Sequence, residues 1–143
     1  KKTSNTQGRS LAKKTAVVGA VERKGNILAK VVGDTTSATI KPFIRDNVQI
    51  NSNIHTDDYK SYKNINKLGY KHSQVEHGKK HWVNGDSYTN SIEGFWSQLK
   101  RSIKGTYHFV SPKHLQAYVN EFSFRYNKRN QTTPIFKSIL QLV

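Results

Sequence analysis

Apolar residues in the first part of the chain fall in two short runs. Residues 15–22 (TAVVGAVE) and 27–32 (ILAKVV) are rich in Val, and Arg23–Asn26 separates them with a polar link that contains Gly25. β-Branched runs joined by a short link of this kind are typical of a β-hairpin. We therefore expect the domain to open on two antiparallel strands.

The pattern then alternates between helical and extended segments. A helix over 35–48 would be capped by Thr35 or Thr36, because a hydroxyl can accept a hydrogen bond from a free N–H group at a helix start. A second helix is expected over 59–68, closed by Gly69. The expected strands beside these helices, and the polar loop that follows them, are residues 53–57, 70–75 and 76–88.

The second half of the chain is expected to be helical. One apolar stripe at helical spacing, ended by Gly105, consists of Ile92, Phe95, Trp96, Leu99 and Ile103. Ser111-Pro112 and Thr133-Pro134 each place a hydroxyl before a proline, which predicts two further helix starts. The residues expected to face inward from these helices are Leu115, Tyr118, Val119, Phe122 and Tyr126, then Ile135, Phe136, Ile139 and Leu140.

Composition restricts the size and the partners of this domain. The 143 residues suffice for one ordinary domain, so we expect a flexible basic lead-in over 1–14 and a single domain over 15–143. There are 24 Lys and Arg against 9 Asp and Glu, and the resulting net charge of +15 favours a polyanionic partner, most commonly nucleic acid. No apolar run approaches the ~20 residues of a membrane span, so we expect no membrane partner. Without cysteine, a disulfide framework, a zinc ribbon and a thiol nucleophile are excluded.

Two positions carry acids that could take part in chemistry. Asp57 and Asp58 lie at the end of the strand expected at 53–57, and acids at a strand end point into the crevice where α/β sheets bind ligands. The alternative is an ordinary Asp-rich turn. Glu93 lies beside the apolar stripe of its helix and shares one flank with Asn90, Ser97 and Lys100. The alternative there is a solvated helix face.

A third group of charged residues lies further along the chain. Glu121, Arg125 and Lys128 follow the spacing i, i+4, i+7. A Glu placed four residues before an Arg is ordinary support for a helix, so a structural role competes with a functional one here.

Four blocks of sequence resemble one known family. They are VVGAVER (17–23), HTDDYKSY (55–62), NSIEGFWSQLKR (90–101) and GTYHFVSPKHLQAYVNEFSFRYNKR (105–129). Together they look like a DDE-type bacterial insertion-sequence transposase of the group with the ISXO-like transposase domain, over about residues 8–137. The resemblance implies a mixed α/β fold of the ribonuclease-H type, a sheet with flanking helices, whose acids hold two divalent metal ions. It also implies a cytoplasmic bacterial protein that joins the nucleoid when bound to DNA.

The resemblance assigns roles to particular residues. Asp57 matches the second catalytic aspartate and Glu93 the third acidic position, so both would be catalytic and would bind Mg²⁺, for which Mn²⁺ can substitute. Lys100 matches a catalytic basic residue, and Asn90 is a lesser catalytic candidate. We expect the carboxylates of Asp57 and Glu93 within roughly 10 Å of each other, as a pair of metal ions would require. The cations expected to contact DNA are Lys100, Arg101, Lys104, Arg125 and Lys128.

The implied partners are double-stranded DNA, as terminal inverted repeats and as target, and a further copy of the chain. In this family the first strand of the sheet is central and ends in the first catalytic aspartate, and it would precede Lys1. We therefore expect this chain to lack that strand, as a truncated piece or a decayed copy, and residues 1–143 alone neither to cleave nor to join DNA. The alternatives are a non-catalytic basic nucleic-acid-binding fragment and a ribonuclease-H-like nuclease that cuts without joining.

Overall fold

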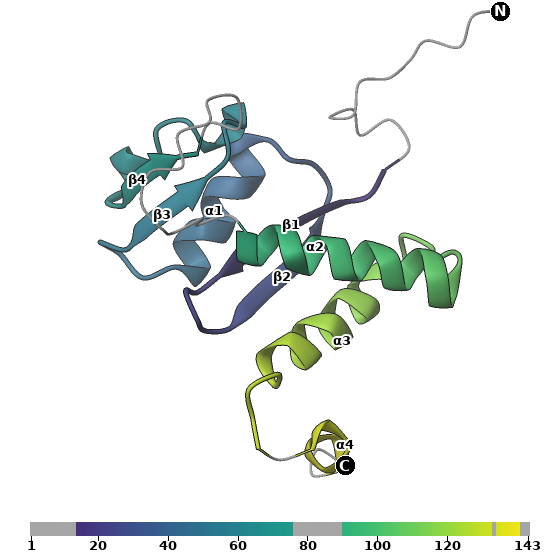
Figure 1. The fold of residues 1–143 in the computed structure, drawn as a ribbon. Helices are drawn as coiled ribbons and strands as arrows, with labels where there is room; N and C mark the ends of the chain where they lie inside the picture. Colours follow the sequence, from purple (N-terminus) through teal and green to yellow (C-terminus); the bar gives the residue numbers. More distant parts are fainter. Residues whose placement is uncertain (1–13, 76–89, 133, 141–143) are drawn as a thin grey trace, which may run out of the picture. The chain divides into compact units, whose positions relative to one another are not determined.

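A computed structural model of the protein describes residues 14–75, 90–132 and 134–140 (Figure 1). The expected lead-in, apart from Lys14, and the expected polar loop at 76–88 lie outside the described residues. The described residues contain both strands and helices, so the mixed α/β class is confirmed. They divide into two compact units, the first with residues 14–18 and 31–75, the second with 19–30, 90–132 and 134–140.

The predicted hairpin is present. Strand β1 (Ala16–Val21) pairs with β2 (Ile27–Val32), and the chain reverses between them. In the turn, the N–H of Glu22 donates to the carbonyl of Asn26 over 2.9 Å. Alternate side chains of β2 are buried and exposed, as expected for a strand with one covered face.

Helix α1 (Ser37–Asn47) also agrees with the sequence, with Thr36 at its N-cap, but its start is held differently from the expectation. The Thr36 hydroxyl makes no capping bond to the helix. Instead, Asp34 Oδ1 accepts hydrogen bonds from the Thr36 N–H (2.8 Å) and from the hydroxyls of Thr36 and Thr39. These bonds, the Thr39 hydroxyl first, hold the pKa of Asp34 below its usual value.

Strands β3 (Asn53–Thr56) and β4 (Lys71–Gln74) form a parallel pair, and both agree with the predicted strands. The helix expected over 59–68 is wrong. Two short 3₁₀ turns, η1 (Lys60–Tyr62) and η2 (Ile65–Leu68), occupy the segment instead.

Long-range hydrogen bonds and one left-handed residue explain why this connection is not a continuous helix. Asn64 has φ 64° and interrupts the helical path between η1 and η2. Ser61 is tied to the segment before α1, because its hydroxyl donates to the Thr35 carbonyl over 2.6 Å. Gly69 closes η2 in the left-handed conformation (φ 88°), as the sequence predicts.

In the second unit, helix α2 (Asn90–Ser102) buries Phe95 and Leu99 of the predicted apolar stripe. Trp96 lies against the backbone of β1, where a Cβ on Gly19 would come within 2.8 Å of the indole ring. The expectation that Gly105 ends this helix is wrong. A π-helical turn, η3 (Ile103–Tyr107), continues from α2 and passes through Gly105.

Helix α3 (Leu115–Asn127) begins later than Ser111-Pro112 predicts. The residues before it form single turns, in which the His114 N–H donates to the Ser111 carbonyl over 3.0 Å. Val119 is fully buried on the predicted inner face. The Tyr126 ring meets the ring of Phe95 edge to face at 5.8 Å, so α2 and α3 pack through aromatic side chains.

Helix α4 (Ile135–Leu140) forms where the sequence predicts a third helix. Ile135 and Leu140 are 36% and 58% exposed, so the expectation that they point inward is wrong. A helix this short buries little on its own, and its apolar residues need a partner surface to be covered. Thr133 and the side chains of Phe136 and Ile139 lie outside the described residues.

Candidate functional site

Asp57 is the first residue after β3, at the carboxyl end of the parallel pair. Its side chain is half-buried, and Oδ1 accepts a hydrogen bond from the N–H of Tyr59 over 3.1 Å. The hydroxyl of Thr56 donates to the Asp57 carbonyl over 2.8 Å. Both the backbone and one carboxylate oxygen of Asp57 are therefore held in place, and no residue in the described ranges forms an ion pair with it.

The charge of Asp57 acts on a neighbouring tyrosine. The pKa of Tyr62 is raised to about 12, first by burial of the phenol and then by the negative charges of Asp57 and Tyr59. Tyr62 therefore stays protonated at neutral pH, and its pKa reports the charge on Asp57.

His72 is connected to Asp57 through Thr56. The Nε2 atom of His72 lies 2.9 Å from the Thr56 hydroxyl oxygen. Because the single hydroxyl proton of Thr56 is donated to the Asp57 carbonyl, the hydroxyl must accept from His72, and Nε2 carries the proton. Burial, and then the nearby His55, lower the pKa of His72. The neutral ring therefore offers Nδ1 as an acceptor.

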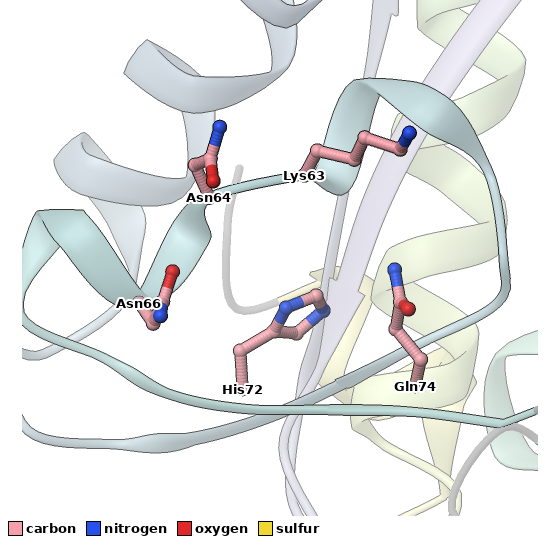
Figure 2. Close-up of a pocket in the computed structure, with 5 residues that line it drawn as sticks. All are labelled: Lys63, Asn64, Asn66, His72 and Gln74. Atoms are coloured by element: carbon pink, nitrogen blue, oxygen red, sulfur yellow. The ribbon is translucent and has the colours of Figure 1, made fainter.

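His72 also lines a polar cavity beside β4 (Figure 2). The cavity has a volume of about 300 Å³ and is lined by Lys63, Asn64, Asn66, His72 and Gln74. Its lining holds one lysine, three side-chain amides and no carboxylate. Such a lining offers mostly hydrogen-bond donors and suits an anionic group such as a phosphate. The pattern that could have found it is the alternation of His72 and Gln74, which places both on one face of β4.

The second unit carries the predicted polar strip on α2. Asn90, Glu93, Ser97 and Lys100 are all exposed, while Phe95 and Leu99 of the neighbouring stripe are buried. Glu93 lies in the first turn of the helix, where the helix dipole favours an acid. Arg101 and Lys104 are also exposed, at the end of α2 and in η3. The strip is thus accessible to a ligand.

The structure places the two predicted metal-binding acids in different units. Asp57 belongs to the first unit, and Glu93, with Asn90 and Lys100, belongs to the second. The expected approach of the two carboxylates stays a prediction. Within the described ranges no three His, Asp or Glu side chains gather in a group that could hold a metal ion.

Of the downstream charged residues, Glu121 and Arg125 pair with each other. Arg125 donates to the Glu121 carboxylate over 2.6 Å across one turn of α3, and both side chains are exposed. The Lys128 ammonium lies 5.9 Å from the ring of Phe124. These contacts support the helix by a few tenths of a kcal/mol, and the expected DNA contacts of Arg125 and Lys128 stay predictions.

Sequence reasoning missed Asn127 at the end of α3, which binds the hairpin. The amide of Asn127 makes two hydrogen bonds with Ile27: Oδ1 accepts from the backbone N–H over 2.7 Å, and Nδ2 donates to the carbonyl over 3.0 Å. Arg129 places its guanidinium 3.9 Å from the centre of the Tyr126 ring and donates to the Gly25 carbonyl over 3.2 Å. Ile27 and Gly25 lie about a hundred residues from Asn127 and Arg129 in sequence, so no local pattern could have predicted these hydrogen bonds.

Comparison with known proteins gives two results. Residues 1–127 match the sequence model of a family described as ISXO2-like transposase domain. A protein of Haemophilus influenzae named an uncharacterized transposase-like protein is 29% identical over 104 residues, which cover 73% of this chain and 83% of that protein. In the described part of the chain, no helix is long and apolar enough to cross a membrane.

Proposed function

The chain belongs to the family of ISXO2-like transposase domains, and on this premise we propose that it cuts and joins DNA at the ends of an insertion sequence. The family match over 1–127 carries the proposal, because it includes Asp57, Glu93, Asn90 and Lys100. The DNA substrates are the terminal inverted repeats and a target site.

The proposed fold is of the ribonuclease-H type. Supporting it, a hairpin is followed by a helix, then by a parallel strand pair with an acid directly after its first strand, and then by helices. Acids at the carboxyl ends of strands are where ligands bind in open α/β sheets. In this proposal Asp57 supplies one carboxylate of the active site and Glu93 another.

The donor set suits a hard divalent cation. Carboxylate oxygens are the ligands that Mg²⁺ prefers, and Asp57 has one oxygen already oriented by Tyr59. Asp57 and Glu93 would hold Mg²⁺ or Mn²⁺, which when bound supplies charge stabilisation for attack of water or of a 3′-hydroxyl on a phosphodiester.

The chain's own cations then hold the DNA. Lys100, Arg101 and Lys104 are exposed on α2 and η3, where they can contact backbone phosphates. Lys100 lies two turns from Glu93 on the same helix flank, so a phosphate held by Lys100 lies along the same strip as the acid.

The test is a nicking and strand-joining assay with labelled terminal-repeat DNA and the protein expressed from its complete reading frame. We expect products in Mg²⁺ or Mn²⁺, and loss of both reactions in Asp57→Asn and in Glu93→Gln. Asp46→Asn is the matched control, because Asp46 is an exposed acid on α1 that pairs with the adjacent Arg45. It should react as the unmodified protein does.

Other outcomes would identify the alternatives. DNA binding without metal-dependent products in either metal would indicate a binding module. Nicked products without joined ones would indicate a nuclease. Equal activity of Glu93→Gln and Asp46→Asn would remove Glu93 from the active site.

A further inference from the structure

Phe109 is an apolar side chain held out into solvent. It is 77% exposed, more than Leu28 (45%), Ile50 (54%) or Leu140 (58%). A single exposed apolar residue is common on protein surfaces and by itself needs no explanation. Three further observations distinguish Phe109 from the others.

The first observation is the backbone that presents it. His108 has φ 57° and ψ −46°, and the N–H of Phe109 donates to the carbonyl of Tyr107 over 2.5 Å. This is a γ-turn with a positive φ at its central residue, a rare and strained conformation for a residue with a side chain. It follows directly after the π-helical turn η3, another irregularity found often at functional sites.

The second observation is that the base of this turn is fixed. The ring of Tyr107 packs against the ring of Tyr118 on α3, with centroids 4.6 Å apart at an interplanar angle of 74°. The strained turn is therefore anchored by a half-buried aromatic contact at Tyr107, two residues before the exposed Phe109. An aromatic ring with two rotatable bonds on an anchored turn loses little freedom when it binds a partner.

The third observation is the charge around it. Residues 94–120 contain Lys100, Arg101, Lys104 and Lys113 but no Asp or Glu. Lys104 and Lys113 lie on either side of Phe109 in sequence, and both are exposed, as are His108 and His114. A polyanion would be repelled by nearby carboxylates, so it favours a surface without Asp or Glu, whereas an apolar partner has no such requirement.

From these observations, and resting on the proposed action on DNA, we propose that Phe109 stacks on an unpaired base of the DNA while the flanking cations hold the adjacent phosphates. Aromatic side chains bind unstacked bases regardless of sequence because every base has a π-face. The bases of an intact duplex are stacked on one another, so the ring would find its partner at an end, a nick or an opened step. Phe109 would thus favour the DNA forms that occur during strand cleavage.

The test compares two labelled DNAs with the same duplex sequence, one blunt and one with a short unpaired overhang, by fluorescence anisotropy. The unmodified protein should bind the overhang DNA roughly tenfold more tightly, as expected for one stacked base. Phe109→Ala should bind both DNAs equally, with an unchanged salt dependence because no charge is lost. Phe109→Leu should behave like Phe109→Ala, whereas Phe109→Trp should retain the preference.

Two controls separate stacking from charge and from general apolarity. Lys104→Gln should weaken binding to both DNAs alike and lower the slope of log K against log salt by about 1. Ile50→Ala removes an exposed apolar side chain of the first unit and should leave the preference unchanged. The thermal unfolding temperature of each variant should match that of the unmodified protein, because Phe109, Lys104 and Ile50 are all exposed.

The inference and the proposed function fail in different ways. If the protein binds DNA with steep salt dependence but Phe109→Ala keeps the overhang preference, the stacking proposal is overturned and the DNA function stands. Loss of the preference in Phe109→Trp as well would also overturn stacking. If Phe109→Ala instead dissociates an oligomer and leaves the preference intact, the ring belongs to a protein interface. If the unmodified protein binds neither DNA, the proposed function fails and the inference falls with it.

Discussion

At the scale of single residues, Asp57 is held by its neighbours while part of its carboxylate remains available. One oxygen accepts from the Tyr59 N–H, and the carbonyl accepts from Thr56. Such fixing matters for a ligand, because a carboxylate that is already oriented loses less freedom when it binds. The same fixed charge acts on Tyr62, and this effect can be measured without any metal.

We predict that Asp57→Asn lowers the pKa of Tyr62 from about 12 toward, but not to, the ordinary value of 10. The negative charge beside the phenol disappears, while the burial that contributes most to the shift remains. NMR titration of ring-labelled tyrosines measures it. Asp46→Asn is the control, and a Tyr62 pKa that is equal in the two variants would contradict the placement of Asp57.

His72 gives a second prediction, on the pH dependence of stability. Its folded-state pKa lies below the ordinary value of 6.5, so below that pH the unfolded chain binds the proton more readily. The contribution of His72 is therefore fully present above about pH 6.5 and is lost as pH falls through the folded-state pKa.

Urea unfolding between pH 8 and pH 5 tests this, with His72→Gln as the comparison. The variant should lose less stability on acidification than the unmodified protein, because it has no His72 that takes up a proton more readily when the chain unfolds. A pH-independent difference between the two proteins would show that His72 protonates as readily in the folded chain as in the unfolded one.

At the scale of elements, the sequence predicts best where one periodicity runs uninterrupted. The stripe of α2, with Phe95 and Leu99 buried, and the hairpin of β1 and β2 are both confirmed. The helix predicted over residues 59–68 is wrong because Asn64 adopts a left-handed conformation and Ser61 bonds to Thr35. The local pattern of apolar residues indicates neither feature. The predicted end of α2 at Gly105 is also wrong, because the π-helical turn η3 continues through that residue.

The same distinction between local and long-range features applies to the candidate site. Asp57 and the strip around Glu93 could be predicted because a strand end and a helix flank are local features. The bonds from Asn127 to Ile27 could not, because these two residues meet only in the folded chain. The cavity beside β4 is an intermediate case, because strand alternation places His72 and Gln74 on one face but does not predict the residues that complete the lining.

Replacing either of two glycines by alanine should change the free energy of unfolding, in opposite directions at the two positions. Gly19→Ala places a methyl group within 2.8 Å of the Trp96 ring, so we predict a loss of about 1–3 kcal/mol in the free energy of unfolding. Gly94 lies in α2 and is exposed, and a Cβ there meets nothing within 4 Å. Gly94→Ala should therefore stabilise the protein by about 0.5–1 kcal/mol.

Denaturant unfolding of the two variants beside the unmodified protein measures this pair. An equal change in the free energy of unfolding in Gly19→Ala and Gly94→Ala would mean that Trp96 does not lie against the β1 backbone in solution.

At the scale of the whole molecule, charge dominates what the chain can bind. A net charge of +15 on 143 residues attracts DNA through many phosphates, whatever the acids do. We predict that Asp57→Ala changes duplex affinity by less than about threefold at about 0.1 M salt, because Lys and Arg contacts set the affinity.

Anisotropy titrations over a range of salt concentrations measure it. The slope of log K against log salt should be steep and equal for Asp57→Ala and the unmodified protein. A much weaker affinity in Asp57→Ala would assign Asp57 a part in DNA binding beyond holding a metal ion.

The two hydrogen bonds from Asn127 to Ile27 decide in which direction the hairpin can be extended. They occupy the N–H and the carbonyl of Ile27 at the start of β2, and Gln116 donates to the carbonyl of Ala29, two residues further along the strand. Strand β1 has no second strand neighbour among the described residues. A strand that joins this hairpin therefore adds along β1. If two copies paired along β1, each would cover the unpaired edge of the other, so the assembly would stop at a symmetric dimer. A hairpin with two unpaired edges could instead add further copies and form a fibre.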